Sequence, residues 1–302
     1  MRRLSAFITF IFIVVSSCSK TEVPVVPSAE STAVKVHVSL PEAAKAVFDS
    51  DGQGSLVNHW VVEVRDCENP ESVVLHQEKD SPEGVLEQTF ELPLVLYHNY
   101  NIAFWADNKG CYDTGNLSDV AVVSPSGNKE MFDAFCCVLD TYTYTGDEEL
   151  SATLKRPLSQ VNFITTDLQL LKENSSKDAL AYYEPEDFVL TLPAATRYDV
   201  FSEAVIGSSI TTLRLSASKM YGDFSAGAEN TTLFMGYVFG DSSSLKDINI
   251  KFVSNSITYS YDLANVPFKK NYRTNIFGNF FDGKVTCSVY VDSEWFGEIT
   301  AE

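Results

Sequence analysis

Apolar and polar side chains alternate with a period of two residues in many short segments of this chain, and this pattern constrains the fold most. In "AVKVHVSL", Val34, Val36 and Val38 point one way, while Lys35 and His37 point the other. The segments "HWVVEVR", "LEQTFEL" and "YNIAFWAD" follow the same rule, and clusters of Gly, Pro, Asn and Asp separate them. The pattern predicts half-buried β-strands joined by tight turns.

The second half of the chain has the same character. Its segments "QVNFITTD", "DFVLTLP", "TTLFMGYVFG", "DINIKFVS", "ITYSYDL" and "VTCSVYVD" are rich in β-branched and aromatic residues. The best helix candidate, residues 167–183, reads equally well as a short helix or a long loop. Many short strands predict an all-β protein with two tandem antiparallel β-sandwich domains. We place these domains at residues 33–148 and 149–302, and we find no internal repeat in the sequence.

The N-terminal 17 residues have the features of a secretory signal peptide. Arg2 and Arg3 supply positive charge, Phe7 to Val15 form an apolar run, and two serines follow. The run is shorter than the roughly 20 apolar residues of a stable transmembrane helix. We therefore predict that residues 1–17 are a signal peptide rather than a membrane span.

The signal peptide ends in "VSSC", which resembles the lipobox of bacterial lipoproteins. The resemblance implies that Cys18 is acylated and becomes the first residue of the mature protein. The alternative is an ordinary signal peptide with an incidental cysteine, which is less favoured because no A-x-A site precedes Cys18. Two or more acyl chains would hold the protein on a membrane without a spanning helix. Residues 18–32, rich in Pro, Ser and Val, are predicted to be a lipidated tether.

The charge of the chain argues against one class of partner. It has 22 Lys and Arg against 41 Asp and Glu, a formal charge of −19. Removal of the signal peptide takes away two arginines and leaves 20 basic against 41 acidic residues, a charge of −21. Such a surface repels phosphate backbones, so nucleic acid is not an expected partner.

Two motifs resemble parts of enzyme or metal sites but lack essential residues. "VFGDSSS" resembles the nucleophile block of GDS-type lipases and esterases, yet all four histidines precede Ser242, whereas those hydrolases take their base from a later block. "DSDGQGSLVNHW" begins like a calcium-binding loop, but Trp60 stands where the bidentate glutamate is required. A Ser-rich loop and an acidic turn are the simpler interpretations.

The spacing of the histidines and cysteines gives no better site. The four histidines are 22, 17 and 22 residues apart, without a paired His or Cys motif, so no zinc site is expected. Five cysteines other than Cys18 show no disulfide framework. The sequence therefore predicts no catalytic residue, no metal site and no cofactor, and we expect the protein not to be an enzyme.

Five segments in series carry a resemblance to a known family. They are "YNIAFWAD", "GCYDTGNLSDVAV", "DAFCCV", "LKRPLSQVNF" and "ANVPFKKNYRTNIFGNFF". Together they resemble the fimbrillin superfamily of Bacteroidales, the lipoprotein-derived subunits of type V pili and related surface proteins, over Val34 to Trp295. The resemblance implies two transthyretin-like β-sandwiches and a protein that is lipid-anchored in the outer membrane, exposed at the cell surface and associated with a pilus.

The resemblance also implies partners. Family members assemble with other pilus subunits, or with copies of themselves, by strand exchange, a form of β-augmentation. Here Ala33–Leu40 would be the first strand, and Val285–Val291 with its tail to Glu302 would be a C-terminal donor or closing strand. A structural pilus subunit of this kind is also an adhesion candidate, for host or bacterial surface glycans or proteins.

One departure from the family pattern concerns proteolytic processing. Family stalk subunits are cut after a basic residue, usually arginine, in the early loop. The first arginine after Cys18 is Arg65, inside a predicted strand and therefore a poor protease target. The remaining candidate processing sites are Lys20, Lys35 and Lys45, of which Lys45 in "PEAAKAVF" is the best placed. The missing early arginine favours an anchor or accessory subunit over a stalk subunit.

A basic cluster stands out in the acidic chain. Lys269, Lys270 and Arg273 are a candidate docking patch for another subunit. The alternative is structural: Tyr272 and Arg273 brace a turn, while the neighbouring residues pack in the core. In that interpretation the core residues are Ile276, Phe277 and Phe280.

The main alternative function is a surface glycan-binding lipoprotein. Sugar-binding platforms need exposed aromatic side chains. Trp60 and Trp105 lie in apolar strand contexts and are expected in the core, whereas Trp295 in "DSEWFGE" is a candidate for exposure. Two exposed, coplanar aromatic rings beside acidic side chains would favour this alternative.

Overall fold

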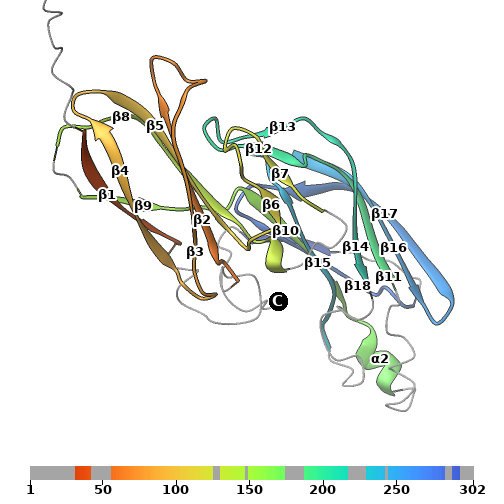
Figure 1. Cartoon of the computed structure of the whole chain (residues 1–302). Helices are drawn as coiled ribbons and strands as arrows, with labels where there is room; N and C mark the ends of the chain where they lie inside the picture. The colour runs from red at the N-terminus through yellow and green to blue at the C-terminus, as the bar shows by residue number, and fades with distance from the viewer. Residues whose placement is uncertain are drawn as a thin grey trace, which may run out of the picture. The chain divides into compact units, whose positions relative to one another are not determined.

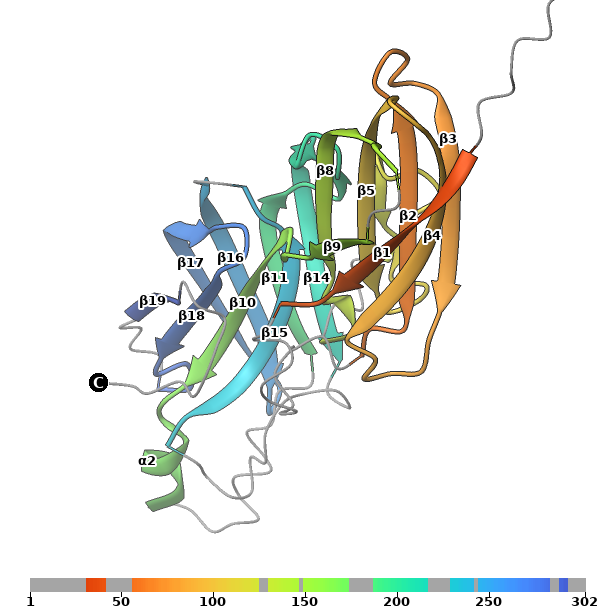
Figure 2. The same cartoon turned by 90° about the vertical axis from the view of Figure 1, so that its left-hand side faces the viewer.

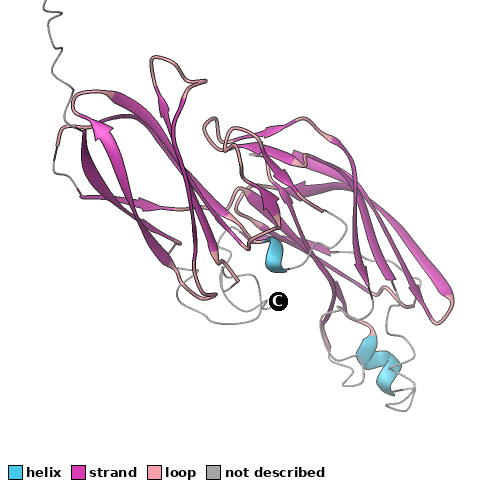
Figure 3. Cartoon of the chain, viewed as in Figure 1, coloured by secondary structure: helices cyan, strands magenta, loops and turns pink. Residues whose placement is uncertain are grey.

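The computed structural model describes residues 31–41, 56–124, 130–146, 149–173, 187–216, 229–241, 244–282 and 288–292. All of them belong to one compact unit, Ser31–Glu302. The described residues form five β-sheets and very little helix, which confirms the predicted all-β class (Figures 1 and 3). Cys18, Lys45 and Trp295 lie outside the described residues, as does most of the calcium-like loop.

The first sandwich is built from two sheets with the strand orders β4-β1-β9 and β3-β2-β5-β8. Its strands are β1 (Ser31–Ser39), β2 (His59–Asp66), β3 (Val73–Asp80), β4 (Glu87–Val95), β5 (Asn99–Asp107), β8 (Phe135–Thr143) and β9 (Glu149–Thr153). The alternating valines of β1 and apolar residues of β2, β4 and β5 share one buried cluster between the sheets. The strands form here because one side of each is apolar and must be buried.

The second sandwich has the strand orders β15-β10-β18-β19 and β14-β11-β16-β17. Its strands are β10 (Leu158–Thr165), β11 (Asp187–Ala194), β14 (Ser209–Ser216), β15 (Thr231–Phe239), β16 (Ser244–Ser254), β17 (Ile257–Phe268), β18 (Arg273–Gly278) and β19 (Ser288–Asp292). A phenylalanine-rich cluster fills its core. Helix α2 (Leu168–Glu173) occupies the start of the predicted helix candidate, and residues 174–183 lie outside the described residues.

The two sandwiches share one topology, although the sequence shows no repeat. With the seven main strands of each numbered in chain order, one sheet reads 4-1-7 and the other 3-2-5-6 in both halves. In both, the first strand pairs in parallel with the seventh: β1 with β9, and β10 with β18. All other strand pairs are antiparallel, as predicted.

A small fifth sheet takes strands from both halves of the sequence, in the order β13-β12-β7-β6. Its strands are β6 (Tyr112–Asp113), β7 (Val120–Val122), β12 (Arg197–Asp199) and β13 (Ala204–Ile206). A short 3-10 helix, η2 (Glu130–Phe132), precedes β8. The β12–β13 hairpin thus leaves the second half of the chain to pair with a strand of the first.

The domain boundary between residues 148 and 149 stays a prediction. Strand β9 begins at Glu149 and pairs with β1, and Leu154 is buried in the first core. Lys155 forms an isolated bridge with Cys136 of β8. We therefore propose that the chain crosses to the second sandwich after Lys155. No helix among the described residues has the length and apolar character needed to cross a membrane.

Candidate functional site: the first strand and the aromatic seam

Strand β1 lies in the centre of its sheet, with β4 on one side and β9 on the other (Figure 2). Val34, Val36 and Val38 are at most 1% exposed, and Leu40 is fully buried. Full burial of such a side chain contributes about 1.5–3 kcal/mol. The predicted first strand, Ala33–Leu40, therefore matches a strand that the core holds firmly.

The neighbours of β1 would form an apolar groove without it. On the β4 side, Val36 faces Phe90 and Val34 faces Leu92, and on the β9 side Val38 faces Ala152. The inward side chains of both neighbouring strands belong to the same buried cluster. The backbone groups that now bond to β1 would also lose their partners, which is costly unless another strand replaces it.

The outer face of β1 is polar. Lys35 lies between Glu91 of β4 and Glu149 of β9 in the strand register, so opposite charges face it on both sides. The His37 ring nitrogen Nδ1 lies 3.0 Å from the Thr89 hydroxyl oxygen Oγ1, which is hydrogen-bond distance. A polar hollow of about 390 Å³ lies beside His37. Lys35 stays a predicted processing site, now placed within a paired central strand.

The two sandwiches differ in whether a further strand pairs with their seventh strand, which is β9 in the first and β18 in the second. In the second, β19 covers the outer edge of β18 by antiparallel pairing from Arg273↔Asp292 to Phe277↔Ser288. In the first, no described strand pairs with the outer edge of β9. The C-terminal strand, predicted over Val285–Val291 as donor or closing strand, occupies a closing position over Ser288–Asp292.

An aromatic seam connects residues from both halves of the sequence. We use this name for Trp105, Tyr112, Phe132, Tyr198 and Phe239, which are all buried in one cluster. Ring centres lie 5.3 Å apart for Trp105–Tyr112, 5.8 Å for Tyr112–Phe239 and 5.3 Å for Tyr198–Phe239. Such pairs contribute about 0.5–1.5 kcal/mol beyond the area that they bury. The predicted burial of Trp105 is confirmed, as is that of Trp60 in the first core.

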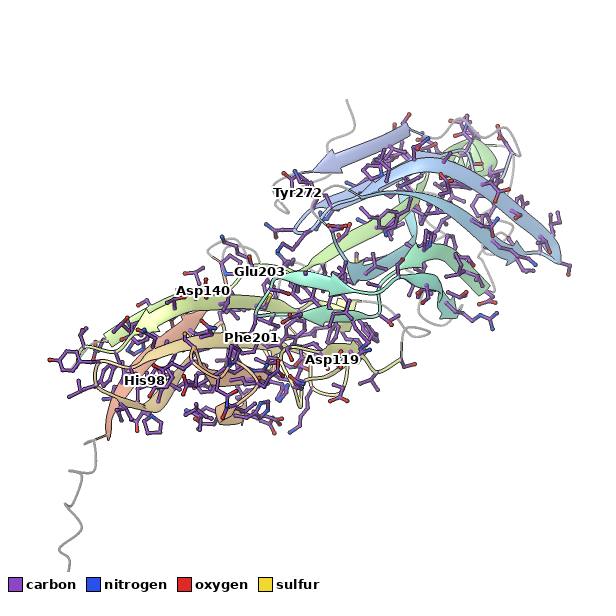
Figure 4. All side chains as sticks on the ribbon, turned by 90° about the horizontal axis from the view of Figure 1, so that it is seen from above. His98, Asp119, Asp140, Phe201, Glu203 and Tyr272 are labelled. Carbon is purple, nitrogen blue, oxygen red and sulfur yellow. The ribbon has the colours of Figure 1, made fainter. Side chains whose placement is uncertain are left out.

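Buried ion pairs support the seam. Arg156, on the crossover after β9, donates to both carboxylate oxygens of Asp133 at 2.8 and 2.9 Å, and both side chains are at most 4% exposed. Its guanidinium carbon also lies 4.5 Å from the ring centre of Phe135. On the surface, Arg197 of β12 pairs with Asp119 beside β7 (Asp119 is labelled in Figure 4). A buried pair of this kind is costly to break because the remaining charge stays desolvated.

A second buried pair anchors the segment between β6 and β7. Glu63 accepts hydrogen bonds from Arg65 Nε at 2.8 Å and from the Leu117 backbone N–H at 3.1 Å. Arg65 in turn donates to Asn116 Oδ1 at 2.8 Å, and its guanidinium carbon lies 4.6 Å from the Phe201 ring centre. Phe201 directly follows β12, so this pair joins β2 to the hairpin from the second half.

A row of acids and histidines crosses the same face of the sheet. His59 Nδ1 lies 2.8 Å from Asp107 Oδ1, and Glu78 lies 3.4 Å from both His59 Nε2 and His76 Nε2. His76 Nδ1 lies 3.0 Å from Glu63 Oε2. Burial opposes the charged form of His59, but hydrogen bonding to Asp107 and its charge outweigh this effect and raise the His59 pKa. Burial raises the pKa of Asp107 despite the bond to His59.

The described residues contain no group of side chains suited to hold a metal ion, and Cys67, Cys136 and Cys137 are not activated thiols. Within the described ranges, no group of three or more His, Cys, Asp and Glu side chains is arranged to hold a metal ion. Cys67, Cys136 and Cys137 are free thiols. Burial raises the pKa of Cys137 to about 12, so its reactive thiolate form is scarce at neutral pH.

The candidate docking patch is divided by the fold. Lys269 Nζ donates to the Tyr272 hydroxyl at 2.8 Å, and Lys270 Nζ lies 4.0 Å from Glu203 (Tyr272 and Glu203 are labelled in Figure 4). Arg273 is 3% exposed, so only the two lysines present charge to solvent. The docking role stays a prediction. The alternative packing of Ile276, Phe277 and Phe280 in the core is confirmed.

The "VFGDSSS" segment has a structural explanation at its glycine. Strand β15 ends at Phe239, and a Cβ on Gly240 would lie 2.6 Å from backbone atoms of Lys270. Glycine is therefore the residue that permits this close approach. Ser242 lies outside the described residues.

The aromatic seam was not predicted from the sequence, although apolar residues on both faces of β2 indicated that both faces are covered. The alternation in "HWVVEVR" predicts one buried face of β2, formed by Trp60, Val62 and Val64. In the structure, Val61 and Glu63 on the other face are also at most 1% exposed. Apolar residues on both faces of a strand indicate that both faces are covered. The apolar positions of "HWVVEVR" and "YNIAFWAD" carry that signal.

Several solved structures share this fold. A proposed polysaccharide-binding protein from Bacteroides thetaiotaomicron matches with a TM-score of 0.53 and 11% identity, over 89% of this chain and 98% of that one. A proposed cell adhesion protein from Bacteroides ovatus gives 0.52 and 10%, over 89% and 99%. Another from Bacteroides uniformis gives 0.52 and 10%, over 87% and 99%.

These likenesses show a shared fold, and that fold agrees with the one implied by the predicted resemblance to the fimbrillin superfamily. A search of curated proteins finds no significant match. One family model matches nearly the whole chain after the first 26 residues. The chain belongs to that family, the family of unknown function DUF6562, which matches residues 27–302.

Proposed function

We propose that this protein is a fimbrillin-like lipoprotein of the outer cell surface, with a structural and adhesive role rather than an enzymatic one. It acts as a pilus anchor or accessory subunit. The fold supports this proposal because it is shared with proposed cell adhesion proteins of two Bacteroides species. The observation that carries the anchor role is the position of β1, a central strand that begins 13 residues after the candidate lipid site Cys18 and is paired on both sides from Lys35 to Ser39.

The proposed assembly mechanism is strand exchange with other pilus subunits or with a copy of this chain. Loss of β1 would open an apolar groove between β4 and β9, and a donor strand from a neighbour would restore its hydrogen bonds. The uncovered edge of β9 offers a second place for strand addition. An anchor keeps β1 and its lipid, whereas a stalk subunit loses both.

The deciding experiment is the intact mass and N-terminal sequence of native protein recovered from cell surfaces. We expect a blocked, acylated Cys18, as an anchor requires. A free N-terminus after Lys35 or Lys45 would instead mean that β1 is removed and that the protein polymerises. The variant Cys18→Ala should leave the membrane fraction, and unchanged membrane partition would refute the lipid anchor.

The glycan-binding alternative has weaker support. Of the aromatic side chains whose exposure is described, Tyr97 alone is exposed, at 78%, so the pair of rings expected of a sugar platform is not present in that part of the chain. One protein of the same fold is a proposed polysaccharide binder. Binding of purified surface polysaccharides to the native protein, with Tyr97→Ala as the comparison, separates the two proposals.

A further inference from the structure

The outer edge of β17 is the longest free strand edge of the described structure. Strand β17 has 12 residues and lies at the margin of its sheet, where its only strand partner is β16 (Figures 1 and 4). A free edge presents unpaired N–H and C=O groups, and natural proteins usually protect such edges with charges, prolines, bulges or short length.

Every other outer strand among those described has such protection. Strand β3 carries Lys79, β4 carries Pro93 and β14 carries Arg214. The register of β8 and β15 is irregular, and β6, β9, β13 and β19 have five residues or fewer. Between Ile257 and Ala264, β17 has regular pairing up to residue 263 and a single charged residue, Asp262. Beyond that segment β17 has Pro267 and an irregular register opposite Lys246–Ile248, so the part of its edge that is open to pairing is residues 257–263.

The hairpin geometry identifies which backbone groups point outward. Ser254 and Ile257 close a two-residue turn whose residues Asn255 and Ser256 have φ of 50° and 60°. In such a hairpin the closing pair is hydrogen-bonded, and hydrogen-bonded and non-hydrogen-bonded pairs then alternate. The backbone groups of residues 258, 260 and 262 therefore point away from β16, with Ser260 in the middle of the free edge.

The inward side chains of β17 are also incompletely covered. Tyr259, Tyr261 and Leu263 pack against the second core but remain only half-buried. Tyr259 stacks on Phe252 with ring centres 4.8 Å apart, and Tyr261 donates to the Phe280 carbonyl at 2.5 Å. These rings are fixed in place, so little conformational entropy would be lost when a neighbouring strand covers them.

We propose that β17 pairs antiparallel with β17 of a second copy of this chain and joins the two sheets into one. If the two-fold axis passes through Ser260 or through Tyr261, the inward side chains of both copies lie on the same face of the joined sheet. In the first register Asp262 faces Thr258, and in the second it faces Ser260, so a hydroxyl and never a second carboxylate lies opposite. The edge is therefore complementary to itself.

The overall charge sets a testable condition on this dimer. Two copies that each carry many more acidic than basic residues repel one another, and salt screens this repulsion over about 8–10 Å at physiological ionic strength. Dimer formation should therefore strengthen as salt rises. A heterologous partner with a basic strand would show the opposite dependence on salt.

The test is sedimentation analysis of the full mature protein in detergent, at low and high salt, with two variants of Ser260. Ser260→Pro removes the central outward N–H but no backbone bond to β16, and it also removes the exposed 3.4 Å hydrogen bond from Asn249 Nδ2 to Ser260 Oγ. It should raise the dimer dissociation constant about tenfold or more. Ser260→Thr keeps that N–H and should dimerise like the parent. Equal thermal unfolding of both variants shows that the fold is intact.

Three results would overturn the proposal. They are a parent protein that stays monomeric up to about 100 µM at high salt, equal weakening of the dimer by Ser260→Thr, and a dimer unaffected by Ser260→Pro. If Ser260→Pro unfolds, the disulfide of Ser260→Cys provides the second measurement. In the register centred on Ser260 it should form between copies, because opposite Cα atoms lie about 5.5 Å apart there. Tyr261→Cys tests the register centred on Tyr261 in the same way, and failure of both disulfides counts against the pairing.

Discussion

The two sandwiches have the same strand order but fill and close it differently. The first core combines valines and leucines with a few aromatic rings, whereas the second contains a connected set of phenylalanines. The first ends in β9, whose outer edge has no partner among the described strands, and the second ends in β18 with β19 beside it. One topology is therefore reached with two different sets of core residues, which indicates that the alternation of apolar residues and the turn positions specify it more than the identity of the core side chains does.

The largest expected effect tests the phenylalanine core. Phe188 stacks on Phe234 at 4.8 Å and on Phe252 at 5.7 Å between ring centres. Its ring also contacts Phe163, with ring centres 5.5 Å apart. Phe188→Ala should lower the free energy of unfolding by about 3–5 kcal/mol, since it leaves a cavity and removes all three ring contacts. Urea denaturation measures the loss.

Among the described residues, the Phe90 ring has one aromatic neighbour, Phe104, with ring centres 6.2 Å apart. Phe90→Ala should therefore lower the free energy of unfolding less than Phe188→Ala does. The reverse order would contradict the proposed difference between the cores.

A second substitution tests whether the sandwiches unfold together. Arg156→Met should lower the free energy of unfolding by about 3–5 kcal/mol, because Asp133 keeps its charge in a buried place without its partner. Calorimetry of the parent should show one transition, and the variant should show an earlier or a divided one. The control Arg197→Met breaks the exposed pair with Asp119 and should change the free energy of unfolding little, because solvent screens that pair. Equal effects of the two would mean that burial of the seam is not decisive.

The pH dependence of stability tests the acid and histidine row, which the first sandwich alone contains. The His59 pKa is raised in the folded state, so its stabilising contribution is complete below about 6.5, the unfolded value, and is lost as pH rises through the folded value. The free energy of unfolding should therefore fall with rising pH above about 6.5. Chemical denaturation at a series of pH values measures this slope. In His59→Gln the slope should flatten, and an unchanged slope would exclude His59 as its source.

The smallest expected effect concerns a turn. Tyr97, between β4 and β5, has φ of 59°, a left-handed conformation that costs a bulky residue about 1–2 kcal/mol. Tyr97→Gly should raise the free energy of unfolding of the first sandwich, by less than about 1 kcal/mol because glycine also gains entropy in the unfolded chain. Thermal unfolding measures the change. Destabilisation instead would mean that the exposed ring has contacts that outweigh the strain.

The sequence by itself determined the local elements of this protein. The alternation in "AVKVHVSL" matches β1, and "YNIAFWAD" matches β5, because a strand with one apolar side needs only its own residues to show which side is buried. The all-β class, the burial of Trp60 and Trp105 and the packing role of Ile276 and its neighbours followed from the same rule. Of the candidate site, the first strand was predictable in this way.

The tertiary structure alone decided how distant strands meet. Three features join distant parts of the chain. They are the parallel pairing of β1 with β9, the small sheet that takes the β12–β13 hairpin, and the five rings of the aromatic seam. Periodicity reports which face of a strand is buried, but it carries no information about the segment that covers it. That choice depends on the summed packing and hydrogen bonding of the whole chain, and this is why Val61 and Glu63 are buried on a face that the local pattern left open to solvent.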